Sequence, residues 1–224
     1  MKVMSTLSEP STESSPSGTA ERHVLAIDLG SGGPKAAIVS ETGEIKACAT
    51  GKVSLHILPH AGVEQDPGEW WTCVRDVAKK AIGAAGVSPD TIDAVICDSQ
   101  YFVIVPIDAR GEPLMNALHW MDSRGSTHNT KLIRGILNIE GYGITKLIRW
   151  IRWTGLAPSK SGIDSIGHIL YLKHERPDIY RKTWKFLEPM DYLNLCLTGR
   201  CVASQETMVP FMSVDNRTWN DRIS

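Results

Sequence analysis

The 224 residues are 42% hydrophobic and 22% charged, which is enough to bury one sizeable core or two small ones. A formal net charge of -1 excludes a general attraction to nucleic acid or anionic membranes, and five scattered cysteines without a Cys-x-x-Cys pair argue against a disulfide framework or a zinc site. No apolar run approaches the roughly 20 residues of a membrane span, and the N-terminus lacks the apolar centre of a signal peptide, so we expect a cytoplasmic protein.

The first part of the chain predicts a tail and then three antiparallel strands. Residues 1–21 are rich in Ser, Thr, Pro and Glu, and we expect them to be a disordered tail. Residues 24–39, VLAIDLGSGGPKAAIV, are two apolar runs separated by a turn. Residues 45–50 follow a further turn and alternate in polarity as a half-buried strand does.

The turn within residues 24–39 is the first candidate site. Asp28 ends the first apolar run, and the turn that follows consists of Gly30, Ser31, Gly32 and Gly33. Glycines let backbone N–H groups approach an anion closely, and a carboxylate at a strand end can hold hydrated Mg2+ against the same phosphates. The alternative is an ordinary hairpin whose glycines serve only the turn. We interpret Lys35, at the start of the second strand, as a solvated residue at the edge of the sheet.

A helix is predicted to begin at Pro67. Asp66 suits its N-cap, Glu69 the third position, where it can close a capping box, and Gly86 its C-terminal end. Apolar residues recur at helical spacing between these ends, so we expect the helix to cover one face of the sheet. The paired Trp70 and Trp71 favour core packing over the stacking of a ligand.

The next apolar strand, residues 94–97, follows this long helix, so the sheet is expected to be mixed rather than purely antiparallel. Residues 102–107 predict a further strand before a turn at 108–111. Ligands gather at the carboxyl ends of strands in such sheets, and Asp28 and Gln100 both lie at such ends. We therefore expect these two residues to share one cleft.

Short motifs follow one another over almost the whole chain after the tail. They are Ile27-Asp28-Leu29-Gly30-Ser31, Glu64-Gln65-Asp66-Pro67 with Trp70-Trp71, Trp120-Met121-Asp122-Ser123-Arg124, His174-Glu175-Arg176-Pro177-Asp178-Ile179-Tyr180, Pro189-Met190-Asp191-Tyr192-Leu193 and Leu197-Thr198-Gly199. In this order the chain resembles the N-terminal domain of the FGGY carbohydrate kinases, most of all the xylulokinase branch. The resemblance implies an α/β fold of the ribonuclease-H-like, actin-like ATPase type, with a mixed sheet and flanking helices, over residues 22–224.

The resemblance also implies ligands: ATP, Mg2+ and a sugar or polyol. It carries Asp28 over as the residue near Mg2+ and the transferable phosphoryl group, and the turn from Gly30 to Gly33 as the segment facing the phosphates. Phosphoryl transfer needs mainly positioning and charge neutralisation, which N–H donors and a metal anchor supply. Ser31 adds a hydroxyl donor to this turn.

The sugar side departs from the family pattern. Xylulokinase-like members continue the strand as Ser-Gly-Gln-Met-His-Gly, whereas this chain has Asp98-Ser99-Gln100-Tyr101-Phe102-Val103. Gln100 remains a candidate sugar ligand, and Tyr101 and Phe102 bring aromatic faces where a histidine would donate and accept hydrogen bonds. The loss of that partner changes the discrimination of a polyol site and speaks against xylulose as the substrate.

Three charged residues have two readings each. Asp122 and Arg124 match the family's Trp-x-Asp-x-Arg motif and support the sugar pocket through charge-assisted hydrogen bonds, or Asp122 is the N-cap of a helix reaching about Gly135 and pairs with Arg124. Asp191 lines the cleft or caps the helix it opens, and we prefer the cap.

Residues 146–155, KLIRWIRWTG, favour a helix packed on the domain over a membrane or nucleic-acid patch.

FGGY kinases carry a general-base Asp in a Gly-Asp motif beyond this region, with a nucleotide-binding domain after it. This chain stops at Ser224, and Asp221 has no preceding glycine, so we assign no catalytic residue and expect the base beyond Ser224. We interpret the chain as a kinase fragment that is inactive alone, with a homodimer as the candidate state of the full-length protein. The alternative is a non-catalytic sugar- or partner-binding module, which Pro34, Tyr101 and Phe102 favour.

Overall fold

The computed structural model describes residues 21–211, so the predicted tail, apart from Glu21, and Asp221 lie outside the described residues. The strands are β1 His23–Gly30, β2 Gly33–Ser40, β3 Ile45–Thr50, β4 His56–Leu58, β5 Gly62–Gln65, β6 Ile92–Ser99, β7 Val105–Ile107, β8 Ala117–Leu118, β9 Asn138–Ile139, β10 Tyr142–Gly143 and β11 Lys185–Leu187. The helices are α1 Pro67–Ala85, the 3-10 turn η1 Pro89–Thr91, α2 Ser126–Ile133, α3 Ile144–Thr154, α4 Ser165–Glu175, α5 Pro177–Lys182, α6 Pro189–Thr198 and α7 Gln205–Met208.

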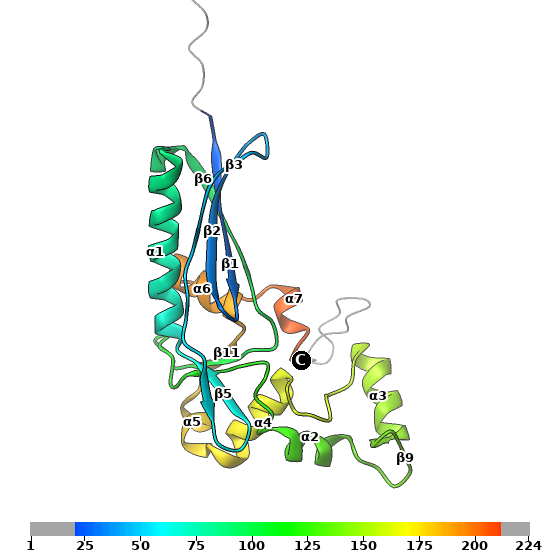
Figure 1. Ribbon diagram of the computed structural model, residues 1–224. Helices are drawn as coiled ribbons and strands as arrows, with labels where there is room; N and C mark the ends of the chain where they lie inside the picture. Colours follow the sequence, from blue (N-terminus) through cyan, green and yellow to red (C-terminus); the bar gives the residue numbers. More distant parts are fainter. Residues whose placement is uncertain (1–20, 212–224) are drawn as a thin grey trace, which may run out of the picture.

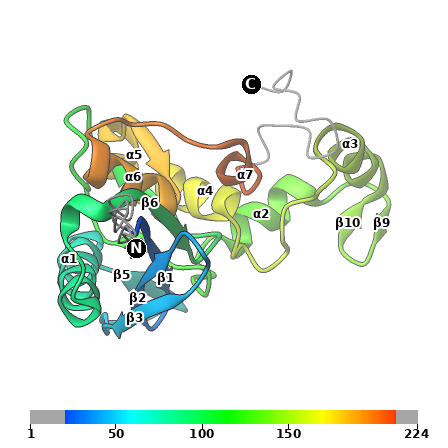
Figure 2. The same ribbon diagram turned by 90° about the horizontal axis from the view of Figure 1, so that it is seen from above.

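The main sheet has the strand order β3-β2-β1-β6, and the view from above in Figure 2 separates these strands. β1 pairs antiparallel with β2, and β2 pairs antiparallel with β3, as the alternating pattern predicted. β6 returns after α1 and pairs parallel with β1, with Leu29 opposite Ser99. The mixed sheet is therefore confirmed, and it brings the carboxyl ends of β1 and β6 side by side.

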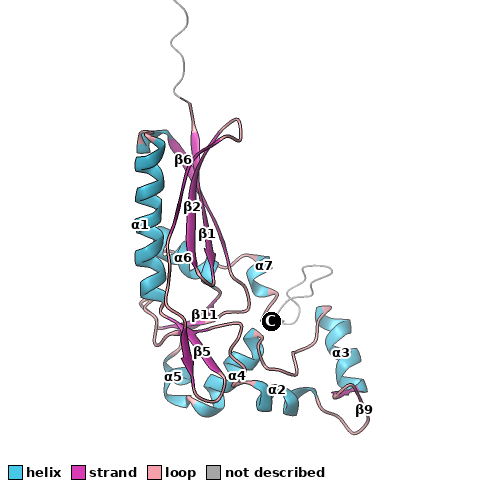
Figure 3. Cartoon of the chain, in the orientation of Figure 1, coloured by secondary structure: helices cyan, strands magenta, loops and turns pink. Residues whose placement is uncertain are grey.

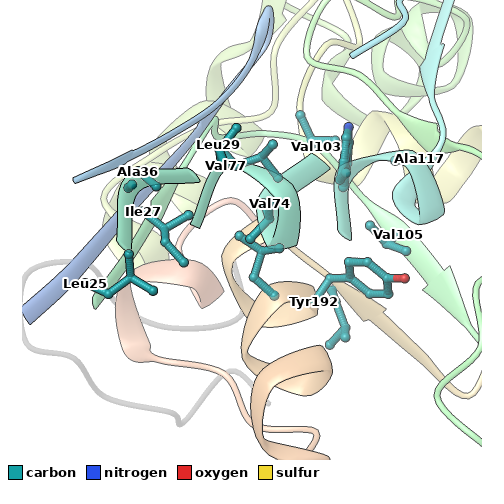
Figure 4. Close-up of a cluster of buried hydrophobic side chains, with 14 of the residues drawn as sticks. Leu25, Ile27, Leu29, Ala36, Val74, Val77, Val103, Val105, Ala117 and Tyr192 are labelled. Carbon is teal, nitrogen blue, oxygen red and sulfur yellow. The ribbon is translucent and has the colours of Figure 1, made fainter. Parts of the chain in front are cut away.

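The core lies between this sheet and α1, which runs along one face of it (Figures 1 and 2). Trp70 on α1 is fully buried, and its ring meets the edge of the Tyr192 ring with centroids 6.5 Å apart. Trp71 is only partly buried, and the Arg75 guanidinium lies 5.7 Å from its ring centre. Core packing of the tryptophan pair is thus confirmed chiefly by Trp70. Figure 4 shows the cluster, with labels on Leu25, Ile27, Leu29, Ala36, Val74, Val77, Val103, Val105, Ala117 and Tyr192.

Both predicted ends of α1 are confirmed. The Asp66 side chain accepts a hydrogen bond from Gly68 N at 2.8 Å, and Gly86 ends the helix with φ 66°. The predicted capping box does not form, because the Glu69 carboxylate instead accepts bonds from Ser54, from its backbone N at 3.0 Å and its Oγ at 3.0 Å. Glu69 therefore ties the β3–β4 connection to the first turn of the helix.

The remaining strands form small sheets beyond the main one. Only residues 105–107 of the predicted 102–107 strand are regular, and this strand pairs with β11 rather than with the main sheet. β4, β5 and β8 form a three-stranded antiparallel sheet. Figure 3 shows the long strands at one end of the molecule and α2, α4 and α5 at the other. Residues 100–104, which include Gln100, Tyr101 and Phe102, connect β6 of the main sheet to β7 of a small sheet.

The helix predicted over residues 146–155 exists as α3, but its packing differs from the prediction. Figures 1 and 2 both place α3, with β9 and β10, on the side of the molecule away from α1. Ile148, Ile151 and Trp153 are 60%, 45% and 53% exposed, so much of the apolar side of α3 is uncovered within the described residues, although Leu147 and Trp150 are partly buried. No helix in residues 21–211 is long and apolar enough to cross a membrane.

Candidate functional site

The glycine turn joins β1 to β2 and has one glycine that the fold itself requires. Gly33 has φ 132°, and a Cβ on it would lie 2.8 Å from Lys52 Cα and overlap the carbonyl oxygen of Gly51. A Cβ on Gly32 would meet no atom within 4 Å, and one on Gly30 would make ordinary contact. The protein's own packing therefore explains Gly33 but leaves open space beside Gly32.

Ser31, at the tip of this turn, joins it to the strand end after β6. Its Oγ donates to Gln100 Oε1 at 2.8 Å and accepts from Trp120 Nε1 at 2.9 Å. Gln100 Nε2 donates to Gln65 Oε1 at 2.8 Å, and Gln65 Nε2 donates to the Ser31 carbonyl oxygen at 2.8 Å, which closes a ring. Gln65 is fully buried, so the turn is held rigidly against Gln100.

The pocket beside this ring has a volume of about 460 Å³. It is lined by Gln100, Tyr101, Phe102, Trp120, Leu156, Ala157, Ser159, Ile163 and Asp164. The structure therefore brings three of the predicted sugar-side residues together in one cavity. Sequence reasoning assigned no role to Gln65 or Trp120, although both stand in motifs that matched the family. Their hydrogen bonds to Ser31 span 34 and 89 residues of sequence, and no local pattern predicts them.

Asp28 stands on the face of the sheet opposite the core and is 46% exposed. Its carboxylate pairs with Lys35 Nζ at 3.1 Å. Lys35 is exposed as predicted, but β2 is an inner strand, so its placement at the sheet edge was wrong. Asp28 is also the register partner of Asp98 in β6, which puts two carboxylates on one face at neighbouring strand ends.

Two carboxylates are a donor set that fits Mg2+, which proteins hold through one or two carboxylates while water and substrate phosphates fill the other positions. Within residues 21–211 no group of three or more His, Cys, Asp or Glu side chains could hold a metal by itself. A metal at Asp28 and Asp98 would therefore depend on phosphate oxygens as further ligands.

Asp122 and Arg124 form a buried ion pair away from the pocket. Asp122 is fully buried, and its Oδ2 accepts from Arg124 Nη2 at 2.6 Å and from Val63 N at 2.9 Å. Arg124 Nη2 also donates to Glu64 Oε1 at 2.7 Å, and its guanidinium lies 4.5 Å from the Tyr171 ring centre. Pairing with Arg124 is thus confirmed, whereas neither residue is among those lining the pocket.

The prediction that Asp122 caps a helix is wrong, whereas Asp191 binds the start of α6 from its first turn, where its carboxyl accepts from the Glu188 backbone N–H. α2 begins at Ser126 with Gly125 at its N-cap, so Asp122 caps no helix; the residues between them form a turn in which Asp122 Oδ1 accepts from Arg124 N. α6 begins at Pro189 with Glu188 at its N-cap, which places Asp191 in the first helical turn. Asp191 is buried and accepts from Thr207 Oγ1 at 3.0 Å.

Glu188 is a buried acid behind the pocket. Its carboxyl accepts from Ser165 Oγ at 2.9 Å and from Val103 N at 3.1 Å, next to the pocket residue Phe102. Burial raises the pKa of Glu188 to about 8 and that of Asp191 to about 6, and the hydrogen bonds only partly oppose this. Burial, with these acids nearby, also raises the pKa of Tyr101 to about 12, so its hydroxyl stays neutral.

The raised pKa of Glu188 predicts a stability that falls with pH. Between the ordinary carboxyl value of 4.5 and about 8 the folded state retains a proton that the unfolded chain has released. The contribution of Glu188 to the free energy of unfolding therefore decreases as pH rises through this window. We expect Glu188→Gln, which is neutral at every pH and can still accept from Val103 N, to flatten this slope in urea titrations.

A matched control for this prediction is Glu41→Gln, which removes an exposed carboxylate from the β2–β3 turn and should leave the slope as in the wild type. Asp191, with its pKa raised to about 6, and His119, with its pKa lowered to about 4, contribute slopes of opposite sign at lower pH, so the two variants are compared at the upper end of the window. An unchanged slope between about pH 6 and 8 in Glu188→Gln would contradict the assignment.

Comparisons with known proteins agree with the sequence motifs. The model of the FGGY family of carbohydrate kinases, N-terminal domain, matches residues 23–224. The chain is 29% identical over 208 residues to the xylulose kinase of Escherichia coli K12, which covers 88% of this chain and 38% of that protein. The chain thus spans well under half the length of this curated relative.

Two solved structures show the same fold. A xylulose kinase from Brucella ovis superposes with a TM-score of 0.76 at 22% identity, over 90% of this chain and 40% of that one. Plasmodium falciparum glycerol kinase with ADP superposes with a TM-score of 0.74 at 21% identity, over 91% and 40%. The mixed sheet with flanking helices is therefore the actin-like ATPase fold of these kinases, as the motifs predicted.

Proposed function

Because the chain belongs to the FGGY family of carbohydrate kinases, we propose that it is the sugar-binding part of an enzyme that moves the terminal phosphoryl group of ATP to a hydroxyl of a sugar or polyol. The proposed domain covers residues 22–224. The observation that carries the proposal is the Ser31 hydroxyl, which bonds to both Gln100 and Trp120 of the pocket. Phosphoryl donor and acceptor must meet at such a junction, because transfer requires their close approach.

On the phosphate side, Asp28 and the turn from Gly30 to Gly33 have complementary roles. Asp28, with Asp98 beside it, would hold Mg2+, and the turn would present N–H groups to the phosphates. The metal supplies charge neutralisation to the transferring phosphoryl group. The open space beside Gly32 supports this use, because the protein's own packing does not need a glycine there. Lys35 would release Asp28 for the metal, since their ion pair is exposed and therefore weak.

On the sugar side, Gln100, Tyr101 and Phe102 would contact the substrate directly, and Trp120 completes this wall. Asp122 and Arg124 would act from behind, by fixing β5 and the turn before α2 through their ion pair. Gln65 would link β5 to the phosphate turn. It follows Glu64 in β5, and its side chain donates to the Ser31 carbonyl oxygen. The proposal thus keeps all five predicted sugar-side residues but gives two of them a supporting role.

We propose that the general base and the nucleotide-binding domain lie outside residues 1–224. The matching family model is that of an N-terminal domain, and the E. coli xylulose kinase is much longer than this chain. The 224-residue chain alone is therefore expected to release no sugar-dependent ADP, since it offers no second domain to close over the reacting phosphate.

The test uses the protein translated from the complete gene, incubated with ATP, Mg2+ and a panel of ketoses and polyols. We expect ADP release to depend on one of the sugars, and Asp28→Asn to lower it on the order of 100-fold by removing a charge that positions the metal. Asp76→Asn, which changes an exposed carboxylate on α1, is the matched control and should keep full activity.

Full activity of Asp28→Asn would contradict the assigned role of that carboxylate. Sugar binding by a complete product that releases no ADP with any sugar would favour the other function, a non-catalytic binding module. The departure at Tyr101 and Phe102 from the family's pattern is the observation in favour of that alternative.

A further inference from the structure

The polar side chains that line the pocket are already bonded to the protein. Gln100 uses Oε1 for Ser31 and Nε2 for Gln65, and Trp120 donates its only N–H to Ser31. The Tyr101 hydroxyl donates its proton to the Glu206 carbonyl oxygen. Little hydrogen-bonding capacity is left on this wall: one amide proton of Gln100 and the remaining lone pairs of the Gln100 and Tyr101 oxygens.

Asp164 and Ser159, on the opposite wall of the pocket, are also bonded to other protein groups. Asp164 is 4% exposed, and its Oδ1 accepts from Asn129 Nδ2 at 2.9 Å and from Gly167 N at 2.7 Å. Its Oδ2 accepts from Ser159 N, and the Ser159 hydroxyl lies 2.5 Å from the Ser161 hydroxyl. This carboxylate therefore serves as the N-cap of α4 and holds the loop before it. It is committed to the protein rather than to a ligand.

The rest of the lining is apolar. Leu156, Ala157 and Ile163 face the pocket together with Phe102 and the Trp120 ring. Phe102 has φ 59°, which is uncommon for a non-glycine residue, and the buried Glu188 carboxyl secures this turn by accepting from Val103 N. The Tyr101 and Phe102 rings meet edge to face with centroids 5.1 Å apart. The aromatic wall is thus held in place rather than free to turn away.

We propose that the substrate of this site is a deoxy sugar or deoxy polyol, whose methyl group packs on Phe102 and Trp120 in place of a hydroxymethyl group. This inference rests on the proposed kinase function and names its substrate class. A hydroxyl buried against Phe102 and the Trp120 ring would lose its bonds to water and find no free hydrogen-bonding group on these two side chains, whereas a methyl group gains by burial. The site therefore discriminates against a fully hydroxylated sugar at that carbon.

The experiment compares sugars that differ in one hydroxyl at either end of the chain. The first pair is 1-deoxy-D-xylulose and D-xylulose, and the second is 6-deoxy-L-tagatose and L-tagatose. Each is titrated into the 15N-labelled 224-residue chain over the millimolar range, and binding is followed at the Trp120 indole and the Tyr101 and Phe102 amide signals. We expect the deoxy member of at least one pair to bind about tenfold more tightly, as loss of one unsatisfied buried hydroxyl implies.

The variant Phe102→His tests the cause of the preference. Histidine tolerates the left-handed backbone region and restores a donor and an acceptor, so the preference should fall to about threefold or less. Trp184→His changes a half-exposed aromatic residue that is not among those lining the pocket, and it should keep the full preference.

The outcomes separate the two proposals. If both pairs bind at the pocket and neither favours its deoxy member, the deoxy inference is overturned while the sugar-binding function stands. If no sugar of either pair shifts the Trp120, Tyr101 or Phe102 signals, the deoxy inference is overturned, while the kinase function is decided by ADP release in the protein from the complete gene. An undiminished preference in Phe102→His would likewise overturn the role given to the aromatic wall.

Discussion

Replacing Gly33 by alanine is expected to lower the free energy of unfolding by about 3 kcal/mol or more. Part of the lost stability is the strain of a non-glycine residue at φ 132°. The rest comes from the overlap of the new Cβ with the Gly51 carbonyl oxygen, because a backbone atom can move away only if the chain around it shifts. The measurement is urea unfolding of the 224-residue chain at neutral pH, followed by tryptophan fluorescence.

Gly32→Ala is the matched control in the same turn. Its Cβ would meet no atom within 4 Å, so we expect a change of less than about 0.5 kcal/mol in stability. In the protein from the complete gene, the same methyl group would occupy the space proposed for the phosphates and lower sugar-dependent ADP release. A Gly32→Ala protein with normal stability and normal activity would contradict the phosphate role of the turn.

Replacing Arg124 by methionine is expected to lower the free energy of unfolding by about 3 to 5 kcal/mol, because it leaves the buried Asp122 and Glu64 carboxylates without their cation. Methionine keeps most of the apolar stem, so the loss is mainly electrostatic. The Arg124 side chain is only 12% exposed, which limits screening by solvent. Thermal and urea unfolding of the 224-residue chain measure the effect.

Arg110→Met provides the comparison at the surface. Arg110 pairs with Asp108 at 3.1 Å, but its side chain is 82% exposed, and exposed pairs contribute about 0 to 1 kcal/mol. If Arg124→Met kept wild-type stability yet lost sugar binding, Arg124 would be a direct sugar ligand, contrary to its position behind the pocket. Equal changes in the free energy of unfolding in the two variants would show that the buried ion pair stabilises the fold no more than the exposed one.

The local features of the fold follow from neighbouring residues. Asp66, Pro67 and Gly86 mark the ends of α1 because their effects act within a few residues: a side-chain cap, a fixed φ, and a left-handed terminus. The strands β1 to β3 follow in the same way from alternation and the turns between them. The parallel return of β6 was predictable because a strand after a long helix needs a crossover connection.

Predictions failed where several partners compete for one side chain. Glu69 was suited to a capping box, yet Ser54 offers it both a backbone N–H and a hydroxyl. Asp122 was suited to an N-cap, yet Arg124 and Val63 N bind it more fully. The apolar spacing of α3 indicated a packed helix but carries no information on which surface, if any, the helix meets.

The sequence by itself determined the family, the mixed sheet, the glycine turn with Asp28, and the departure at Tyr101 and Phe102. Only the tertiary structure decided that Ser31 meets Gln100 and Trp120, that Asp122 and Arg124 lie behind the pocket, and that the pocket's polar groups are already bonded. The physical reason is the separation in sequence of the groups that interact. Caps, turns and alternation act between residues close in sequence, whereas hydrogen bonds across 69 or 89 residues depend on how sheets and helices pack.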